Sequence, residues 1–180
     1  MRDLKYHEKK LLKKVNFVHY KKENPTDLLI ISRYGLSGKE EFSEYLKICA
    51  QLKKLLTAIS ELDDKDPVKH KLSGELAEKF YNMGIIDTPT PSELTKIGVS
   101  AFCRRRISTM LVRMKFAQNL PHAVSLLRHG HIRIGPEIVK DPALIVTRKF
   151  QDFMTWVDTS VMRKKVMEYK GELDDYDLMQ

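Results

Sequence analysis

The stretch RHGHIRIGPEIVKDP, residues 128–142, places two histidines around a glycine and then alternates isoleucine with arginine. Successive side chains of a strand point to opposite faces, so Ile132 and Ile134 would lie on one side and Arg133 on the other. The Gly135-Pro136 pair that follows predicts a turn. The stretch therefore predicts a small hairpin with an apolar inner face and a cationic outer face.

Further strands and two helices are predicted around this hairpin. Residues 138–139 begin the return strand, and ALIV at residues 143–146 predicts a third strand. Upstream, residues 99–117 have the apolar spacing of one helix, and residues 120–129 that of a second helix, which Gly130 would end. Together these elements predict an α+β fold, in which a small module over residues 99–150 combines two helices with short strands.

The positive charge of the chain is concentrated in this module. The 180 residues have a net charge of +8. Residues 100–150 contain ten Lys and Arg against two Asp and Glu, whereas residues 1–99 contain eighteen against fifteen and residues 151–180 four against seven. Charge that served solubility alone would be spread evenly along the chain, so this local excess favours a polyanionic partner.

The cations of the window are the candidate binding residues. Arg106 and Arg113 are two helical turns apart, so a continuous helix would point them the same way. Arginine presents a planar fork that bridges phosphate oxygens and stacks on exposed bases. We expect the contacts to an anionic partner to come from Arg104, Arg105, Arg106, Arg113, Lys115, Arg128 and Arg133, with His131 as an accessory.

The histidines and cysteines do not indicate a metal site. His129 and His131 have no third ligand in view, and no nucleophile that His131 could activate is evident. Two roles for His131 stay open, a contact with the anionic partner and a structural role at the junction of helix and strand. Cys49 and Cys103 lack a partner at metal-binding spacing and lie on apolar helical faces, which favours buried thiols in a reducing compartment. No metal and no cofactor are predicted.

The region before the module, residues 1–98, is predicted to be helical. Residues 4–20 predict a lysine-rich helix, which could be a solvated face, an arm that contacts phosphates or a helix on a membrane surface. KENPTD, residues 22–27, predicts a loop. A capping box of Ser37 and Glu40 begins a helix that runs to about residue 62.

A second long helix completes an antiparallel hairpin in this region. Asp66 would cap it, Pro67 would take its first position and Gly84 would end it. Residues 87–94, DTPTPSEL, predict a linker to the module. After the module, residues 151–180 form an extension with an acidic tail.

Composition also excludes several classes of protein. The apolar runs are too short to span a membrane, and the charged N-terminal residues predict no secretory signal. The helical first half contains no Gly-rich phosphate loop that would indicate a catalytic domain. We therefore expect no enzyme, no small-molecule substrate and no membrane partner.

The residues from Arg104 to Val146 resemble the RNA-binding module named after the fourth small-subunit ribosomal protein, also called the alpha-L motif. The matching positions are an Arg-Arg start, a leucine pair, an alternating strand and the residues Arg113, Ala117, Ala123, Gly130-His131 and Pro142. One departure is Gly135-Pro136, where the commonest form of the module has Asn-Gly. This departure points away from the ribosomal protein itself.

The flanking segments resemble a single eukaryotic family. They are LKYHEKKLLKKVNFVHY at residues 4–20, FMTWVDTS at residues 153–160 and the acidic DDYD at residues 174–177. The family is the ribosomal-protein-like component of the U3 small nucleolar ribonucleoprotein. The resemblance implies action in the nucleolus, within the small-subunit processome, where such proteins help to pair the small nucleolar RNA with pre-ribosomal RNA. It also implies a large acidic scaffold protein of the same particle as a partner.

Three other interpretations remain at this point. The chain could be a structural protein of the mature small ribosomal subunit, which would co-sediment with translating ribosomes. It could be an enzyme that carries the module as an appendage, although the helical first half offers no catalytic site. It could also be a stress factor that acts on stalled ribosomes.

Overall fold

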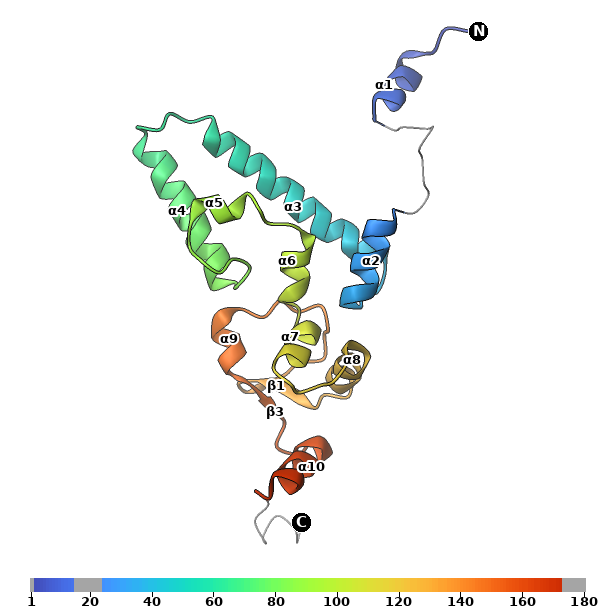
Figure 1. Cartoon of the computed structure of the whole chain (residues 1–180), viewed down its shortest axis with the longest axis vertical. Coiled ribbons are helices and arrows are strands. Elements are labelled where there is room, and N and C mark those ends of the chain that lie inside the picture. Colours follow the sequence, from blue (N-terminus) through green and yellow to red (C-terminus); the bar gives the residue numbers. More distant parts are fainter. Residues whose placement is uncertain (1, 15–23, 173–180) are drawn as a thin grey trace.

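The structure is a computed structural model that describes residues 2–14 and 24–172. The described residues form an α+β fold of ten helices and one three-stranded antiparallel sheet (Figure 1). The helices are α1 (Tyr6–Lys14), α2 (Pro25–Tyr34), α3 (Lys39–Ser60), α4 (Pro67–Asn82), α5 (Pro91–Leu94), α6 (Val99–Arg104), α7 (Ile107–Arg113), α8 (Leu120–Arg128), α9 (Arg148–Asp152) and α10 (Val161–Lys170). The strands are β1 (Ile132–Ile134), β2 (Glu137–Ile138) and β3 (Met154–Trp156).

The molecule has two parts, one above the other in Figure 1. Helices α2 to α6 make the upper part, from which α3 and α4 extend as a long hairpin. The lower part contains α7, α8, α9 and the sheet, and α10 follows at its far end. Helix α1 lies apart from both.

Each of the two parts has its own apolar core. The first core gathers residues from α2, α3, α4 and α6, including Phe42, Tyr45 and Phe102. The second gathers residues of α7, α8 and the sheet, including Met110, Leu127 and Ile132. The change from one core to the other falls within residues 103–107, since Cys103 belongs to the first and Ile107 to the second. The triplet Arg104-Arg105-Arg106 therefore occupies the junction.

Local signals correctly predict the α3–α4 hairpin. The Asp66 side chain accepts a hydrogen bond from the Val68 N–H at 3.3 Å, and Pro67 takes the first helical position of α4. Gly84 follows that helix with a φ of +73°, a left-handed conformation that favours glycine. The predicted capping box is wrong by one residue, because Glu41 and not Glu40 accepts the hydrogen bond from the Ser37 N–H.

The sheet has the order β2-β1-β3, with both pairs antiparallel. The predicted alternation in β1 is confirmed, since Ile132 is fully buried and Arg133 is partly exposed. The third strand predicted at residues 143–146 is wrong. That segment forms only an isolated bridge from Ile145 to Arg106, and β3 supplies the third strand from beyond the predicted module.

Other predicted segments differ from the structure. The loop predicted at residues 22–27 is wrong from Pro25 onward, because Asn24 caps α2 there. The predicted linker at residues 87–94 contains α5, whose Leu94 is buried in the first core. Of the helix predicted over residues 4–20, α1 covers Tyr6–Lys14, and residues 15–20 lie outside the described chain.

Candidate RNA-binding surface

The arginine triplet 104–106 lies at a break between two helices. Helix α6 ends with Arg104, and Arg106 has the extended backbone of an N-cap before α7, with φ −63° and ψ 142°. The Ile107 N–H donates to the Leu144 carbonyl at 2.8 Å, so the backbone here pairs with a distant segment. The single helix predicted over residues 99–117 is therefore wrong, because this long-range pairing replaces helical hydrogen bonds at the junction.

Arg105 is buried between the two parts of the molecule, with 5% of its surface exposed. Its Nε and Nη2 donate to the Val146 carbonyl at 3.0 and 2.7 Å, and its Nη1 donates to Gln151 Oε1 at 3.2 Å. The guanidinium lies directly over Gly84, where an added Cβ would be 2.6 Å from the Arg105 Cζ. Arg105 thus packs the module against the end of α4.

The charge of Arg105 is not balanced by a close carboxylate among the described residues. Burial is the main cause that lowers the pKa of its guanidinium, and the nearby charges of Arg148 and Arg113 lower it further. Neutral carbonyl and amide oxygens accept its hydrogen bonds. Arg105 is therefore a buried cation that is held by neutral acceptors.

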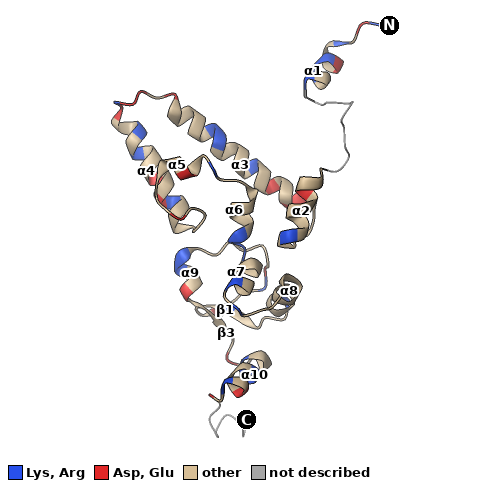
Figure 2. Ribbon diagram, viewed as in Figure 1, with Lys and Arg blue, Asp and Glu red and all other residues tan. Residues whose placement is uncertain are grey.

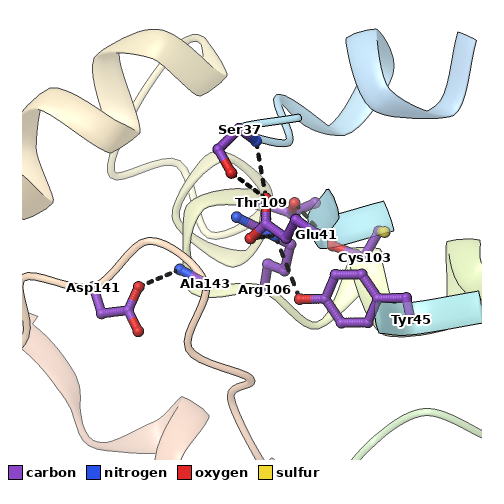
Figure 3. Close-up of polar contacts among 8 residues, drawn as sticks. All are labelled: Ser37, Glu41, Tyr45, Cys103, Arg106, Thr109, Asp141 and Ala143. Atoms are coloured by element: carbon purple, nitrogen blue, oxygen red, sulfur yellow. Dashed lines mark hydrogen bonds and ion pairs between the residues drawn. The ribbon is translucent and has the colours of Figure 1, made fainter. Parts of the chain in front are cut away.

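Arg106 is held by carboxylate and phenol groups of α3, as Figure 3 shows. Its side chain is 3% exposed and forms an ion pair with Glu41, and its Nη1 donates to the Tyr45 hydroxyl at 3.3 Å. Its buried Nε has no hydrogen-bond partner within the described chain. Arg106 thus links the N-cap of α7 to the start of α3.

Glu41 completes this cluster at the N-terminus of α3. Its Oε2 accepts hydrogen bonds from the Ser37 N–H at 2.9 Å and from the Ser37 hydroxyl at 3.0 Å (Figure 3). Burial acts to raise the pKa of Glu41. The hydrogen bonds from Ser37 and Arg106 together with the charge of Arg106 outweigh burial, so the pKa lies below its usual value. The carboxylate is therefore ionised at neutral pH and paired inside the molecule.

The prediction that Arg105 and Arg106 share an outward cationic face with Arg113 is wrong. Both guanidinium groups are buried and bonded within the chain. A charged group in a protein interior requires such partners, and the two segments that supply them, α3 and residues 144–151, are distant in sequence. These arginines hold the two cores together.

Four of the predicted cations are exposed. They are Arg104, Arg113, Lys115 and Arg128, and none of their side chains has a hydrogen bond or ion pair with another described residue. Lys115 follows α7 with a φ of +65°, a conformation that is unusual for a side-chain-bearing residue. Figure 2 shows cations at the base of α6, on α7 and at the start of α9.

The exposed cations do not all gather at one place. Arg113 is close enough to Arg105 to lower its pKa, which puts it on the side of the junction. Arg128 instead lines a groove of about 640 Å³ between α2 and α8, together with Ser32, Gly35 and Asn119. An RNA that contacts both would have to pass across the face of the module.

Arg133 projects from the outer face of β1, as predicted, but it has an acidic neighbour. Its Nη1 is 2.6 Å from the Asp158 carboxylate, and its Nε donates to the Thr155 hydroxyl at 3.2 Å. Its side chain is 34% exposed. Asp158 also pairs with Arg163 of α10. Arg133 can therefore reach a phosphate only in competition with Asp158.

His131 closes the junction between α8 and β1. Its N–H donates to the Leu126 carbonyl at 3.0 Å, and its carbonyl accepts from the Val157 N–H at 3.0 Å. Its Nδ1 lies 2.8 Å from the hydroxyl of Ser160, which is buried. These contacts support the structural role for His131, and its contact with RNA stays a proposal.

Two cations of α9 were absent from the predicted set. Arg148 donates to the carbonyls of Tyr81 at 2.8 Å and Ile86 at 2.9 Å, and its guanidinium lies 4.2 Å from the centre of the Tyr81 ring. Lys149 is exposed beside it. Their position just after Val146, the last core valine of the module, could have marked them as candidate cations in the sequence. Which of them is free to bind a partner depends on the groups that the fold places opposite them.

In residues 2–14 and 24–172, no three His, Cys, Asp or Glu side chains come together in a way that could hold a metal ion. No helix in the same ranges has the length and apolar character needed to cross a membrane.

Family comparisons divide the chain at the same junction. Residues 3–104 match the family described as the ribosomal protein S4/S9 N-terminal domain, and residues 105–149 match the S4 domain. The chain therefore belongs to the S4 class of RNA-binding proteins. The division between residues 104 and 105 coincides with the change from the first core to the second.

Similar proteins define the family more narrowly. The chain is 40% identical to the mouse U3 small nucleolar ribonucleoprotein protein IMP3 over 99% of its length and 98% of that protein. The yeast protein of the same name is 38% identical over 98% of both chains. The small ribosomal subunit protein uS4 of Pyrobaculum neutrophilum is 30% identical over 70% of this chain and 79% of its own. The chain belongs to the IMP3 family.

Proposed function

We propose that the chain is the RNA-binding component of a U3 small nucleolar ribonucleoprotein and acts in the maturation of small-subunit ribosomal RNA. The observation that carries the proposal is an S4 domain in which the side chains of Arg113, Lys115 and Arg128 are exposed and unpaired among the described residues, with Arg104 in the same state just before it. Exposed cations without intramolecular partners are free to neutralise phosphates. The similarity to IMP3 proteins over nearly the whole length supports the U3 small nucleolar ribonucleoprotein as the particle in which the chain binds RNA.

The proposed mechanism is non-enzymatic. Two RNA strands repel each other, and a cationic surface that holds both lowers this repulsion and raises their effective concentration. The small nucleolar RNA and the precursor of the small-subunit RNA would be these strands, and the nucleolus would be the site of action. A large acidic scaffold protein of the same particle would be the protein partner.

The comparisons favour this function over a role in the mature ribosomal subunit. The mouse and yeast IMP3 proteins are 40% and 38% identical across at least 98% of the chain, whereas the Pyrobaculum neutrophilum uS4 protein is 30% identical across 70% of it. A sedimentation experiment separates the two roles. We expect the protein to travel with large precursor particles, and its presence in translating ribosomes would contradict the proposal.

A charge-removal experiment tests the surface itself. The fourfold variant Arg104→Ala, Arg113→Ala, Lys115→Ala and Arg128→Ala should lose most RNA affinity while its circular dichroism is unchanged. The dependence of log Kd on log salt should become shallower by about 3, at about 0.7 for each lost phosphate contact with single strands. Filter binding at several salt concentrations measures both quantities.

The matched control removes four cations from elsewhere. The variant Lys47→Ala, Lys53→Ala, Lys54→Ala and Lys65→Ala has the same net charge, but all four positions lie on the exposed side of the α3–α4 hairpin. This control should keep RNA affinity close to that of the wild type. Equal losses in the two variants would show that net charge alone, and not this surface, drives binding.

Crosslinking in cells, followed by sequencing of the attached RNA, identifies the strands bound.

A further inference from the structure

Two phenylalanine side chains are exposed at the end of α9. Phe150 is 49% exposed and Phe153 is 60% exposed, and neither belongs to the apolar cores. They are three residues apart, and the Phe153 N–H donates to the Phe150 carbonyl at 3.2 Å, so they share one helical turn. Single exposed apolar residues are common on protein surfaces, but two exposed aromatic side chains on one turn form a small patch.

The backbone that carries these rings is firmly held. The Thr147 side chain caps α9 by accepting a hydrogen bond from the Phe150 N–H at 3.3 Å. The Phe153 carbonyl accepts from the Gly135 N–H at 3.0 Å, which ties it to the turn between β1 and β2. Met154, the next residue, is buried in the second core. Binding of a ligand to these two side chains would therefore cost the protein little conformational entropy, because the backbone beneath them is already ordered.

Lys149 is the exposed cation next to this patch. Arg148 begins the same helix, but its guanidinium bonds the carbonyls of Tyr81 and Ile86 and lies 4.0 Å from the Asp87 carboxylate. Asp152, between the two phenylalanines, is exposed as well. The patch thus combines two aromatic side chains with one exposed cation, and surfaces that bind unpaired nucleic acid combine the same two kinds of group.

We propose that Phe150 and Phe153 form a stacking surface for unpaired bases of RNA, with Lys149 holding a neighbouring phosphate. The inference rests on the proposed function and names the kind of RNA that this part of the module binds. Every base has a π face that can stack on an aromatic ring, and Lys149 supplies a positive charge for the phosphate next to a stacked base. An RNA strand awaiting a pairing partner offers such bases.

The test measures binding of a single-stranded RNA oligonucleotide that contains 2-aminopurine, with the duplex of the same sequence for comparison. The double variant Phe150→Leu and Phe153→Leu keeps apolar side chains of similar size but removes the aromatic faces. We expect it to bind the single strand about tenfold more weakly or worse, with the salt dependence unchanged. Quenching of the 2-aminopurine fluorescence should be lost, and duplex affinity should not change.

Three further variants separate stacking from other causes. Phe153→Tyr keeps an aromatic face and should retain affinity and quenching. Tyr169→Leu removes an aromatic ring that is 94% exposed on α10, away from the patch, and should have no effect. Lys149→Ala should make the salt dependence shallower by about 0.7 without abolishing the quenching.

The outcomes distinguish this inference from the function on which it rests. If the phenylalanine double variant binds and quenches like the wild type while the fourfold cation variant loses RNA, the stacking surface is refuted and the proposed function stands. If the wild-type protein binds neither the single strand nor the duplex, the proposed function itself is contradicted. If the double variant keeps RNA but loses a protein partner in a pull-down, the patch is a protein-docking surface and the inference is wrong.

Discussion

Arginines lie both at the junction between the two cores and on the outer surface of the module, and their roles at the two places are opposite. Arg105 and Arg106 are buried at the junction, whereas Arg104, the preceding residue, is exposed. At the junction, carbonyl oxygens and the Glu41 carboxylate lie within hydrogen-bond reach of the guanidinium groups. On the outer surface, the side chains of Arg104, Arg113, Lys115 and Arg128 have no such partners among the described residues, whereas Arg133 is paired with Asp158. A run of arginines therefore indicates nucleic-acid binding only where the fold leaves the guanidinium groups unpaired.

The two junction arginines also differ from each other. Arg106 has a carboxylate partner and acts as one member of a buried ion pair, although its Nε stays unsatisfied. Among the described residues, Arg105 has only neutral hydrogen-bond acceptors, and the charges of Arg113 and Arg148 add to burial in lowering its pKa. Both arginines thus hold the two parts together, Arg106 through an ion pair and Arg105 through neutral acceptors.

The largest effect is expected from removal of the Arg106 side chain. Arg106→Ala should destabilise the protein by about 3 kcal/mol, because it leaves the Glu41 carboxylate partly buried without its cation. The neighbouring Arg104→Ala should change stability by less than about 0.5 kcal/mol, as exposed substitutions usually do. Urea unfolding of both variants measures the difference. Similar losses for the two would mean that the junction and the surface are not distinct.

A smaller loss is expected at Gly84, which lies beneath Arg105. Gly84→Ala should cost about 2 kcal/mol, because alanine disfavours a φ of +73° and its Cβ would displace the Arg105 guanidinium. The matched control is Gly74→Ala within α4, where an added Cβ meets nothing within 4 Å. That substitution should stabilise the protein by about 0.5–1 kcal/mol. Thermal or urea unfolding compares the two, and destabilisation by Gly74→Ala would contradict the assigned cause.

Glu41→Gln should cost about 1.5 kcal/mol at neutral pH, since a hydrogen bond to a charged group becomes one to a neutral group. Its pH dependence identifies the cause. The pKa of Glu41 is lowered in the folded state, so its stabilisation is complete above the usual value of 4.5 and is lost as the pH falls through the lowered folded value. The stability gap between wild type and variant should therefore close at acidic pH. A gap that stayed constant would exclude ionisation of Glu41 as its origin.

The smallest effect is expected for the exposed pair of Arg133 and Asp158. Asp158→Ala should cost below about 1 kcal/mol of stability, because exposed ion pairs contribute little. It should also tighten RNA binding slightly and steepen the salt dependence by up to about 0.7, because Arg133 becomes available to a phosphate. Glu137→Ala removes an acid from the neighbouring strand and is the control for charge alone. If Asp158→Ala and Glu137→Ala change the salt dependence equally, Arg133 gains no phosphate contact when Asp158 is removed.

Local patterns predicted the elements whose signals lie within one segment. Asp66, Pro67 and Gly84 delimit α4, because caps and left-handed glycines act over a few residues. The alternation in β1 correctly predicted which side chains enter the core. Two errors occurred where distant segments compete, at the helix break before Ile107 and at the third strand, which residues 154–156 supply.

Composition and order of residues alone determined that a cationic module follows a helical hairpin, because charge excess and apolar periodicity are properties of the sequence itself. They also determined the resemblance to an RNA-binding family. Only the tertiary structure decided which cations are available, because burial and pairing depend on what the fold places opposite each side chain. Glu41 is 65 residues from Arg106, and Val146 is 41 residues from Arg105. No local pattern carries information about partners at such separations.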